Sequence, residues 1–328
     1  MPVRLTTIAL LTCILAGGPG CAKKPTADEL SKLNRELFQA VDHHDLASAR
    51  RLLAKGANIE TTGYNDMTPL AVAASNDDLP MVQLLLQKGA KAHVKDHSLG
   101  TPLTHAAYVG NTEIVRLLLK QNPDLQEKNQ ALLEAAQFSV AVVLIENPNR
   151  DHSGATVVSG EETVPTLTSP QSEAMKLLLD SGADIEATDQ YRGPPLVDAA
   201  ALAETDRVQL LLQRGANLRA RDKYGNTALI AASCECAQAT MNSAYDVVKI
   251  LLEKGSDVNA HSKDGTTALM NAAGGFGGSA IVKLLLAHGA DPRARDAKGN
   301  TALQYAIAAH REDKVQLLKQ ALARTRKR

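Results

Sequence analysis

The stretch Asp189–Arg221, which reads DQYRGPPLVDAAALAETDRVQLLLQRGANLRAR, holds one complete copy of the pattern that decides the fold. After a turn-like start, an alanine-rich apolar stripe at helical spacing begins at Leu196, and a leucine-rich stripe begins at Val208. A polar break separates the two stripes, and Gly215 ends the second one. Because Asp222 begins the same pattern again, the sequence predicts a stack of short helix pairs.

A leucine followed three residues later by an alanine marks the first helix of every predicted unit. Most successive leucines are 29 to 34 residues apart, but 64 residues separate the fourth from the fifth and 40 the sixth from the seventh. Two stripes that stay in phase over about eight units predict a helical solenoid over residues 30–323. The markers are Leu37/Ala40, Leu70/Ala73, Leu103/Ala106, Leu132/Ala135, Leu196/Ala199, Leu229/Ala232, Leu269/Ala272 and Leu303/Ala306.

The entrances of the first helices carry a second motif. Thr68–Ala74 reads TPLAVAA, Thr101–Ala107 reads TPLTHAA, and three later units open with Thr-Ala-Leu. Threonine can cap the free backbone N–H groups of a helix, and proline in the first turn sacrifices no hydrogen bond. These units resemble ankyrin repeats, which consist of a β-turn and two antiparallel helices. The resemblance implies an all-α ankyrin-repeat solenoid with projecting β-turns and one long insertion.

The wide spacing in the fourth unit leaves that insertion at about residues 139–171, between the two predicted helices. Two β-branched runs, Val140–Ile145 and Ala155–Val158, favour a hairpin there. Insertions in solenoids map to surface loops, so this segment is either a protrusion that grips a partner or a tolerated loop. The smaller additions within Cys234–Tyr245 and at Gly274–Gly278 are interpreted as tolerated loops.

Composition narrows the class of protein. The 328 residues include 36 Lys and Arg against 36 Asp and Glu, so no global charge favours nucleic acid or an anionic membrane. Aromatic residues make up only 3% and tryptophan is absent, which disfavours a deep aromatic ligand pocket. Two of the four cysteines lie in or beside the N-terminal segment, and the remaining pair cannot supply a disulfide framework.

Residues 1–21 stand apart from the repeats, with Arg4 ahead of an apolar run and small residues before Cys21. This pattern is typical of a secretory signal, which is too short to span a membrane permanently. Gly20 and Cys21 resemble the end of the lipobox of bacterial lipoproteins, although the residues before Gly20 depart from it. The resemblance implies a periplasmic protein attached to a membrane only by lipid at Cys21; ordinary cleavage after Ala22 is the alternative.

The segments that flank the array are short and polar. Residues 22–29 contain one proline and predict a tether between the signal and the repeats. Residues 324–328 predict a basic tail that frays into solvent.

Several residue groups invite a catalytic or metal-binding interpretation that their spacing does not support. Cys234 and Cys236 are not spaced as the C-x-x-C of zinc or thioredoxin sites, and we expect them to pack as small residues, with oxidation to a bridge left open. We expect His43-His44 to be solvated turn residues, and Gly274–Gly278 matches no phosphate-binding pattern. The sequence therefore predicts no enzyme activity, no cofactor and no metal site.

One alternative of a different class stays open. A small enzyme, or a ligand- or metal-binding module, could be built on the insertion by its acidic residues and a histidine. These residues are Asp151, His152, Glu161 and Glu162.

The resemblance implies that the projecting turns and first helices form a concave face that binds another protein. Tyrosine and arginine are common anchors of interfaces. The candidate contacts are Tyr64, Asn65, Tyr108, Tyr191, Arg192, Asp198, Lys223, Tyr224 and Lys263. We expect a monomeric, exported scaffold with a protein partner and no nucleic acid. Neutralising a toxin or enzyme as an immunity-type inhibitor and supporting an envelope enzyme are the two uses that the sequence leaves open.

Overall fold

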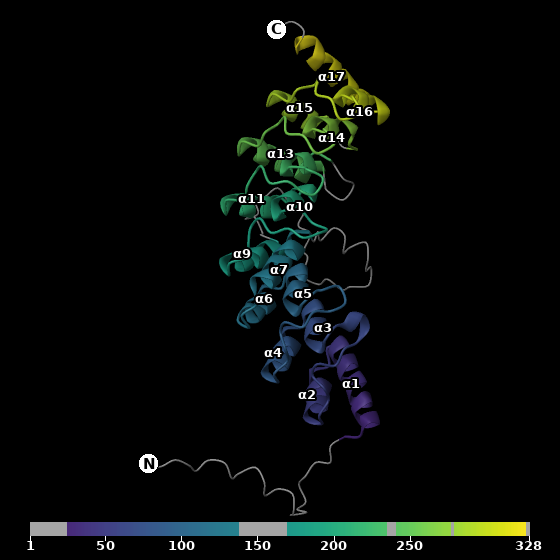
Figure 1. Ribbon diagram of the computed structural model, residues 1–328, viewed down its shortest axis with the longest axis vertical. Coiled ribbons are helices and arrows are strands. Elements are labelled where there is room, and N and C mark those ends of the chain that lie inside the picture. Colours follow the sequence, from purple (N-terminus) through teal and green to yellow (C-terminus); the bar gives the residue numbers. More distant parts are fainter. Residues whose placement is uncertain (1–24, 138–168, 235–240, 277–278, 326–328) are drawn as a thin grey trace, which may run out of the picture.

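The array is one elongated stack of helices, with the N-terminal and C-terminal units at opposite ends (Figure 1). The computed structural model describes residues 25–137, 169–234, 241–276 and 279–325. The described residues form helices and no strands, which confirms the all-α solenoid. The expected signal with Cys21, and the hairpin expected in the insertion, lie outside the described residues.

Each unit contributes one helix to each of two rows that run along the stack (Figure 1). Every first helix packs against the first helix of the next unit, and the second helices do the same. The helix pairs are α1 (Ala27–Asp42) and α2 (Leu46–Ala54), α3 (Pro69–Ser75) and α4 (Leu79–Gln87), α5 (Pro102–Val109) and α6 (Thr112–Leu119), α7 (Leu125–Gln137) and α9 (Pro170–Asp180), α10 (Pro195–Ala201) and α11 (Thr205–Gln213), α12 (Ala228–Ala232) and α13 (Met241–Glu253), α14 (Ala268–Gly274) and α15 (Ala280–Ala287), and α16 (Ala302–Ala308) and α17 (Glu312–Thr325).

The predicted threonine caps are present at the entrances of the first helices. Thr68 Oγ1 accepts the backbone N–H of Ala71 at 3.3 Å. Thr101 and Thr104 form a reciprocal capping box, in which Thr104 Oγ1 accepts the Thr101 N–H at 2.7 Å. Each cap satisfies N–H groups that a helix start leaves without a partner, so the first helix begins at the same place in successive units.

The projecting turns are held by an aspartate and linked to one another. Asp222 Oδ1 accepts the backbone N–H groups of Tyr224 and Asn226, both at 2.8 Å. Gly225 has a φ of 82°, and a side chain there would meet the Lys263 backbone nitrogen at 2.9 Å, so the turn requires glycine. The Lys263 N–H donates to the Tyr224 carbonyl at 2.9 Å, which joins this turn to the next one.

The core lies between the two rows and is built from alanine and leucine. Leu211 on α11 and Leu178 on α9 are both fully buried, as are Ala199 and Ala200 on α10. Burial of Leu211 confirms the helical phase that the sequence predicts. The small alanines allow first helices of neighbouring units to approach closely, while each buried leucine contributes about 1.5–3 kcal/mol.

Several element boundaries differ from the predicted ones. Helix α1 begins at Ala27, inside the tether expected at 22–29, because Thr26 caps it: Thr26 Oγ1 accepts the Glu29 N–H at 3.3 Å. Helix α9 begins at Pro170, near the end of the insertion expected at 139–171, because Ser169 caps it in the same way. Helix α17 runs to Thr325, two residues into the expected basic tail.

The expectation that Cys234 is a buried packing residue is wrong. Cys234 is exposed, since α12 ends at Ala232 and the chain leaves the core immediately after Ser233. Cys236 lies outside the described residues, as does part of the loop that follows Phe276.

A candidate protein-binding face

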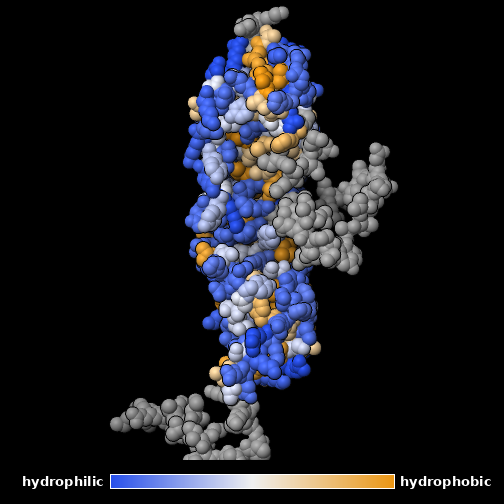
Figure 2. Space-filling view, turned by 90° about the vertical axis from the view of Figure 1, so that its right-hand side faces the viewer, coloured by the Kyte–Doolittle hydropathy of each residue, from blue (hydrophilic) through white to orange (hydrophobic). Residues whose placement is uncertain are grey.

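The nine predicted contact residues lie on projecting turns and first helices within the described residues. Figure 2 views the side of the stack on which the first helices lie, and it shows a mainly hydrophilic surface with hydrophobic areas along its middle. Four tyrosines are the exposed aromatic contacts. Their exposed fractions are 52% for Tyr64, 45% for Tyr108, 72% for Tyr191 and 63% for Tyr224.

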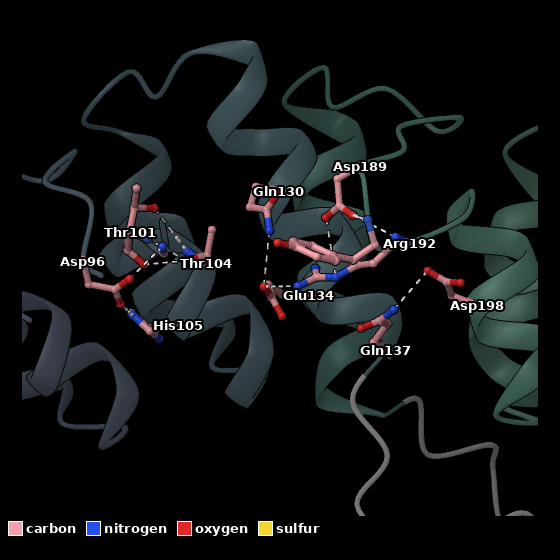
Figure 3. Close-up of polar contacts among 12 residues, drawn as sticks. Asp96, Thr101, Thr104, His105, Gln130, Glu134, Gln137, Asp189, Arg192 and Asp198 are labelled. Atoms are coloured by element: carbon pink, nitrogen blue, oxygen red, sulfur yellow. Dashed lines mark hydrogen bonds and ion pairs between the residues drawn. The ribbon is translucent and has the colours of Figure 1, made fainter. Parts of the chain in front are cut away.

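Arg192 braces the fifth unit against the fourth (Figure 3). Its Nη2 lies 2.6 Å from Glu134 Oε1 on α7, and its Nε lies 3.6 Å from Asp189 Oδ2 in its own turn. Asp189 Oδ1 also accepts the backbone N–H groups of Tyr191 and Arg192, at 2.7 and 2.8 Å. Arg192 is predicted as a partner contact, but most of its guanidinium is occupied in fixing the turn from which Tyr191 projects.

Asp198 on α10 faces the same side of the stack as Gln137, the last described residue of α7 (Figure 3). Gln137 Nε2 donates to Asp198 Oδ2 at 3.4 Å. Burial raises the pKa of Asp198 to about 6, against hydrogen bonds from Gln137 and the Gly193 backbone and the charge of Arg192. This carboxyl can therefore change its charge in mildly acidic conditions, at the junction between the fourth and fifth units.

Lys223, Tyr224 and Lys263 form one group at the tips of two adjacent turns. Lys223 Nζ lies 5.2 Å from the centre of the Tyr224 ring, and Lys263 Nζ donates to the Lys223 carbonyl at 2.7 Å. A shallow depression of about 350 Å³ separates the two turns and is lined in part by these side chains. The structure therefore brings together three of the predicted contacts, with a cation over an exposed aromatic ring.

Tyr64 and Asn65 lie far from that group, near the N-terminal end of the array. The Tyr64 ring packs edge-on against Phe38 with centroids 5.3 Å apart, and its hydroxyl donates to Asp42 Oδ1 at 3.4 Å. Burial and the Asp42 charge raise the pKa of Tyr64. The Asn65 carbonyl accepts the backbone N–H of His97 in the next turn at 2.9 Å. These two residues are partly committed to packing and to linking turns.

Sequence reasoning missed Glu134 and His105, which share a helical register with the predicted Asp198. Each lies two residues after the marker leucine of its unit. His105 Nε2 lies 2.7 Å from Asp96 Oδ2 in the preceding turn (Figure 3), and Asn271, at the same register, donates to the Ile230 carbonyl at 3.0 Å. Applying the register of Asp198 to every unit would have found them.

A metal site and a membrane-spanning helix are both absent from the described residues. They contain no group of three or more His, Cys, Asp or Glu side chains arranged to hold a metal ion. Across the same residues, none of the helices is both long enough and apolar enough to span a bilayer.

Paired helices with projecting turns and an exposed, tyrosine-bearing inner face define a repeat scaffold that presents a surface rather than a pocket. A family model described as ankyrin repeats in three copies matches residues 37–130, 76–156, 167–260 and 236–326. The chain belongs to the ankyrin-repeat family, whose repeats are scaffolds for protein–protein interaction and typically lack enzyme activity. Among curated proteins, no sequence matches this chain.

Proposed function

We propose that this chain is a non-enzymatic scaffold, exported to the cell envelope as a monomer, that binds one partner protein through its concave face. The contact centres on the fifth and sixth units, where Tyr191 and Tyr224 project from turns held by aspartates. The observation that carries the proposal is that two largely exposed aromatic rings project from turns whose backbone N–H groups are held by an aspartate. Rigid aromatic contacts lose little conformational entropy on binding, and they are common hot spots.

The test is capture of a partner from an envelope extract by the full chain and by variants. Tyr191→Ala and Tyr224→Ala should each weaken capture at least tenfold, as expected for loss of a hot spot. Gln209→Ala, on the exposed face of the second helix α11, is the control and should retain capture. Equal capture by all four proteins would contradict binding through this face.

The identity of the captured protein then separates the two uses. A toxic or secreted enzyme whose activity falls on binding indicates an immunity-type inhibitor, while an active envelope enzyme indicates a supporting role. Membrane attachment is tested independently: Cys21→Ser should move the protein from the membrane fraction to the soluble periplasmic fraction. An unchanged distribution would exclude lipid anchoring at Cys21 and leave the binding proposal intact.

A further inference from the structure

In regular units, the end of the first helix is closed by its own chain. A backbone N–H at the start of the second helix donates to the carbonyl of the marker alanine, five residues earlier. This bond is present in the first, second, third, fifth and eighth units. The pairs are Asp45 to Ala40 at 2.7 Å, Asp78 to Ala73 at 2.9 Å, Asn111 to Ala106 at 3.2 Å, Glu204 to Ala199 at 3.0 Å and Arg311 to Ala306 at 2.9 Å.

In the fourth unit, α7 ends at Gln137 and α9 begins at Pro170, so the start of the second helix lies far from the marker alanine in the sequence. Arg207, on α11 of the following unit, instead reaches back to the end of α7. Its side chain is fully buried, and its Nη1 donates to the Ala136 carbonyl at 3.2 Å. A guanidinium therefore satisfies a carbonyl at the helix end, where a positive charge is also favoured by the helix dipole.

The neighbouring Asp206 holds the start of the other helix of the fourth unit. Its Oδ2 accepts the Ser169 backbone N–H at 2.8 Å and the Ser172 hydroxyl at 2.6 Å. Burial alone would raise the pKa of Asp206, but hydrogen bonds from Ser172 and Ser169 lower it below its ordinary value. Asp206 and Arg207, the closing pair, thus contact both helix ends that the fourth unit's own chain leaves far apart in sequence.

In the seventh unit, which carries the glycine-rich addition, a buried cation of the following unit also contacts the end of the first helix. Lys314 on α17 is fully buried, and its Nζ donates to the carbonyls of Ala272 at 2.7 Å and Gly275 at 3.0 Å, at the end of α14. Lys314 and Arg207 occupy one register, immediately before a buried valine. In most other units the register holds an apolar residue, such as Met81, Ile114, Ala174 or Ile281.

Burying a charged side chain is energetically unfavourable, and the surroundings of Arg207 compensate for this burial only in part. Burial lowers its pKa, although Glu204 and Asp206 oppose the change. Its Nε and Nη2 make no hydrogen bond with any described residue, and Nη2 lies 3.7 Å from Glu204. An apolar residue would fill the same position at lower cost, as it does in regular units. A buried cation nevertheless follows two of the three units that carry an addition, which indicates a specific task.

We propose that the closing pair holds the end of α7 and the start of α9 in place, so that these two helix ends of the fourth unit are fixed only when the fifth unit is packed against them. Lys314 of the eighth unit does the same for the end of α14 in the seventh unit. In both units a helix end beside an addition is therefore held by the C-terminal neighbour.

The test is hydrogen exchange of the full chain, resolved to residues 131–137 and 169–176. Arg207→Met removes the charge at similar length and should speed exchange in the last turn of α7 about tenfold, which corresponds to one charge-assisted hydrogen bond. Arg207→Lys should keep most of the protection, since a lysine performs this task at position 314. Ile114→Met, in the same register after a unit with a regular turn, is the control and should leave exchange at the end of α3 unchanged.

Exchange in both segments that stays within twofold of the parent in Arg207→Met, or slows, would overturn the proposal and show a tolerated buried charge. If Arg207→Met does not fold, Arg207→Lys decides: parental protection supports the proposal, and loss of protection contradicts it. Lys314→Met gives an independent measurement at residues 268–275, near the C-terminal end. There, faster exchange at the end of α14 supports the proposal, and unchanged exchange contradicts it.

Discussion

The fourth and fifth units reach the same packing by different routes. The fifth joins α10 to α11 through three residues, Leu202 to Glu204, whereas in the fourth α7 ends at Gln137 and α9 begins at Pro170. Both nevertheless bury a leucine completely at the same register. The shape of a unit is therefore set by its lateral neighbours, as expected for a solenoid in which each unit contacts only the next.

The largest effect should come from truncating those leucines, Leu211 in the fifth unit and Leu178 in the fourth. Leu211→Ala and Leu178→Ala should each lower the free energy of unfolding by about 2–5 kcal/mol, because both leave a cavity in a fully buried site. Urea unfolding followed by circular dichroism measures both. A Leu178→Ala cost under about 0.5 kcal/mol would show that the interrupted unit is packed only loosely.

Asp198 should make the junction between the two units sensitive to pH. Its pKa is raised from 3.8 to about 6, so the folded state holds the proton of this carboxyl more tightly than the unfolded state, and the contribution of Asp198 to stability increases as pH falls from 7 towards 4. Asp198→Asn should remove that gain, which is at most about 3 kcal/mol. Urea unfolding at pH 4.5, 6 and 7.5 measures it, with the exposed Asp246→Asn as control. An unchanged slope in Asp198→Asn would contradict the assignment.

The Asp206 carboxylate at the start of α11 should contribute more to the stability of the fold than its counterpart on α17. Asp206→Ala should cost about 1–3 kcal/mol, because two donors at the start of α9 lose their acceptor. Asp313→Ala, in the same register and exposed, should change stability by less than about 0.5 kcal/mol. Thermal unfolding of both variants provides the measurement, and equal losses would remove the distinction between the two sites.

The smallest effect on stability should come from the exposed tyrosines. Tyr191→Ala should change the free energy of unfolding by no more than about 0.5 kcal/mol, because the ring is 72% exposed. Chemical denaturation is the check, and it also controls the capture experiment. A larger loss would show that the ring supports the fourth–fifth junction instead of standing ready for a partner.

The fold was predictable because the marker leucine and alanine recur at positions whose burial is nearly complete in every internal unit. The turn-borne tyrosines were also predictable, since their positions follow from the repeat. The contact between Glu134 and Arg192 was not, because the insertion separates the two residues in the sequence. Arg207 and Lys314 were missed for another reason: a cation in the first turn of an amphipathic helix ordinarily faces solvent.

Backbone hydrogen bonds link several pairs of successive turns. They join His97 to Asn65, Lys263 to Tyr224 and Ala297 to Asp264. In each pair the second residue of one turn donates its N–H to the carbonyl of the third residue of the turn before. Equivalent positions of the linked turns therefore follow one another at the spacing of one repeat. Tyr191 and Tyr224 are both the third residue of their turns, in successive repeats. A partner that engages both must therefore present two complementary groups at the spacing of one repeat.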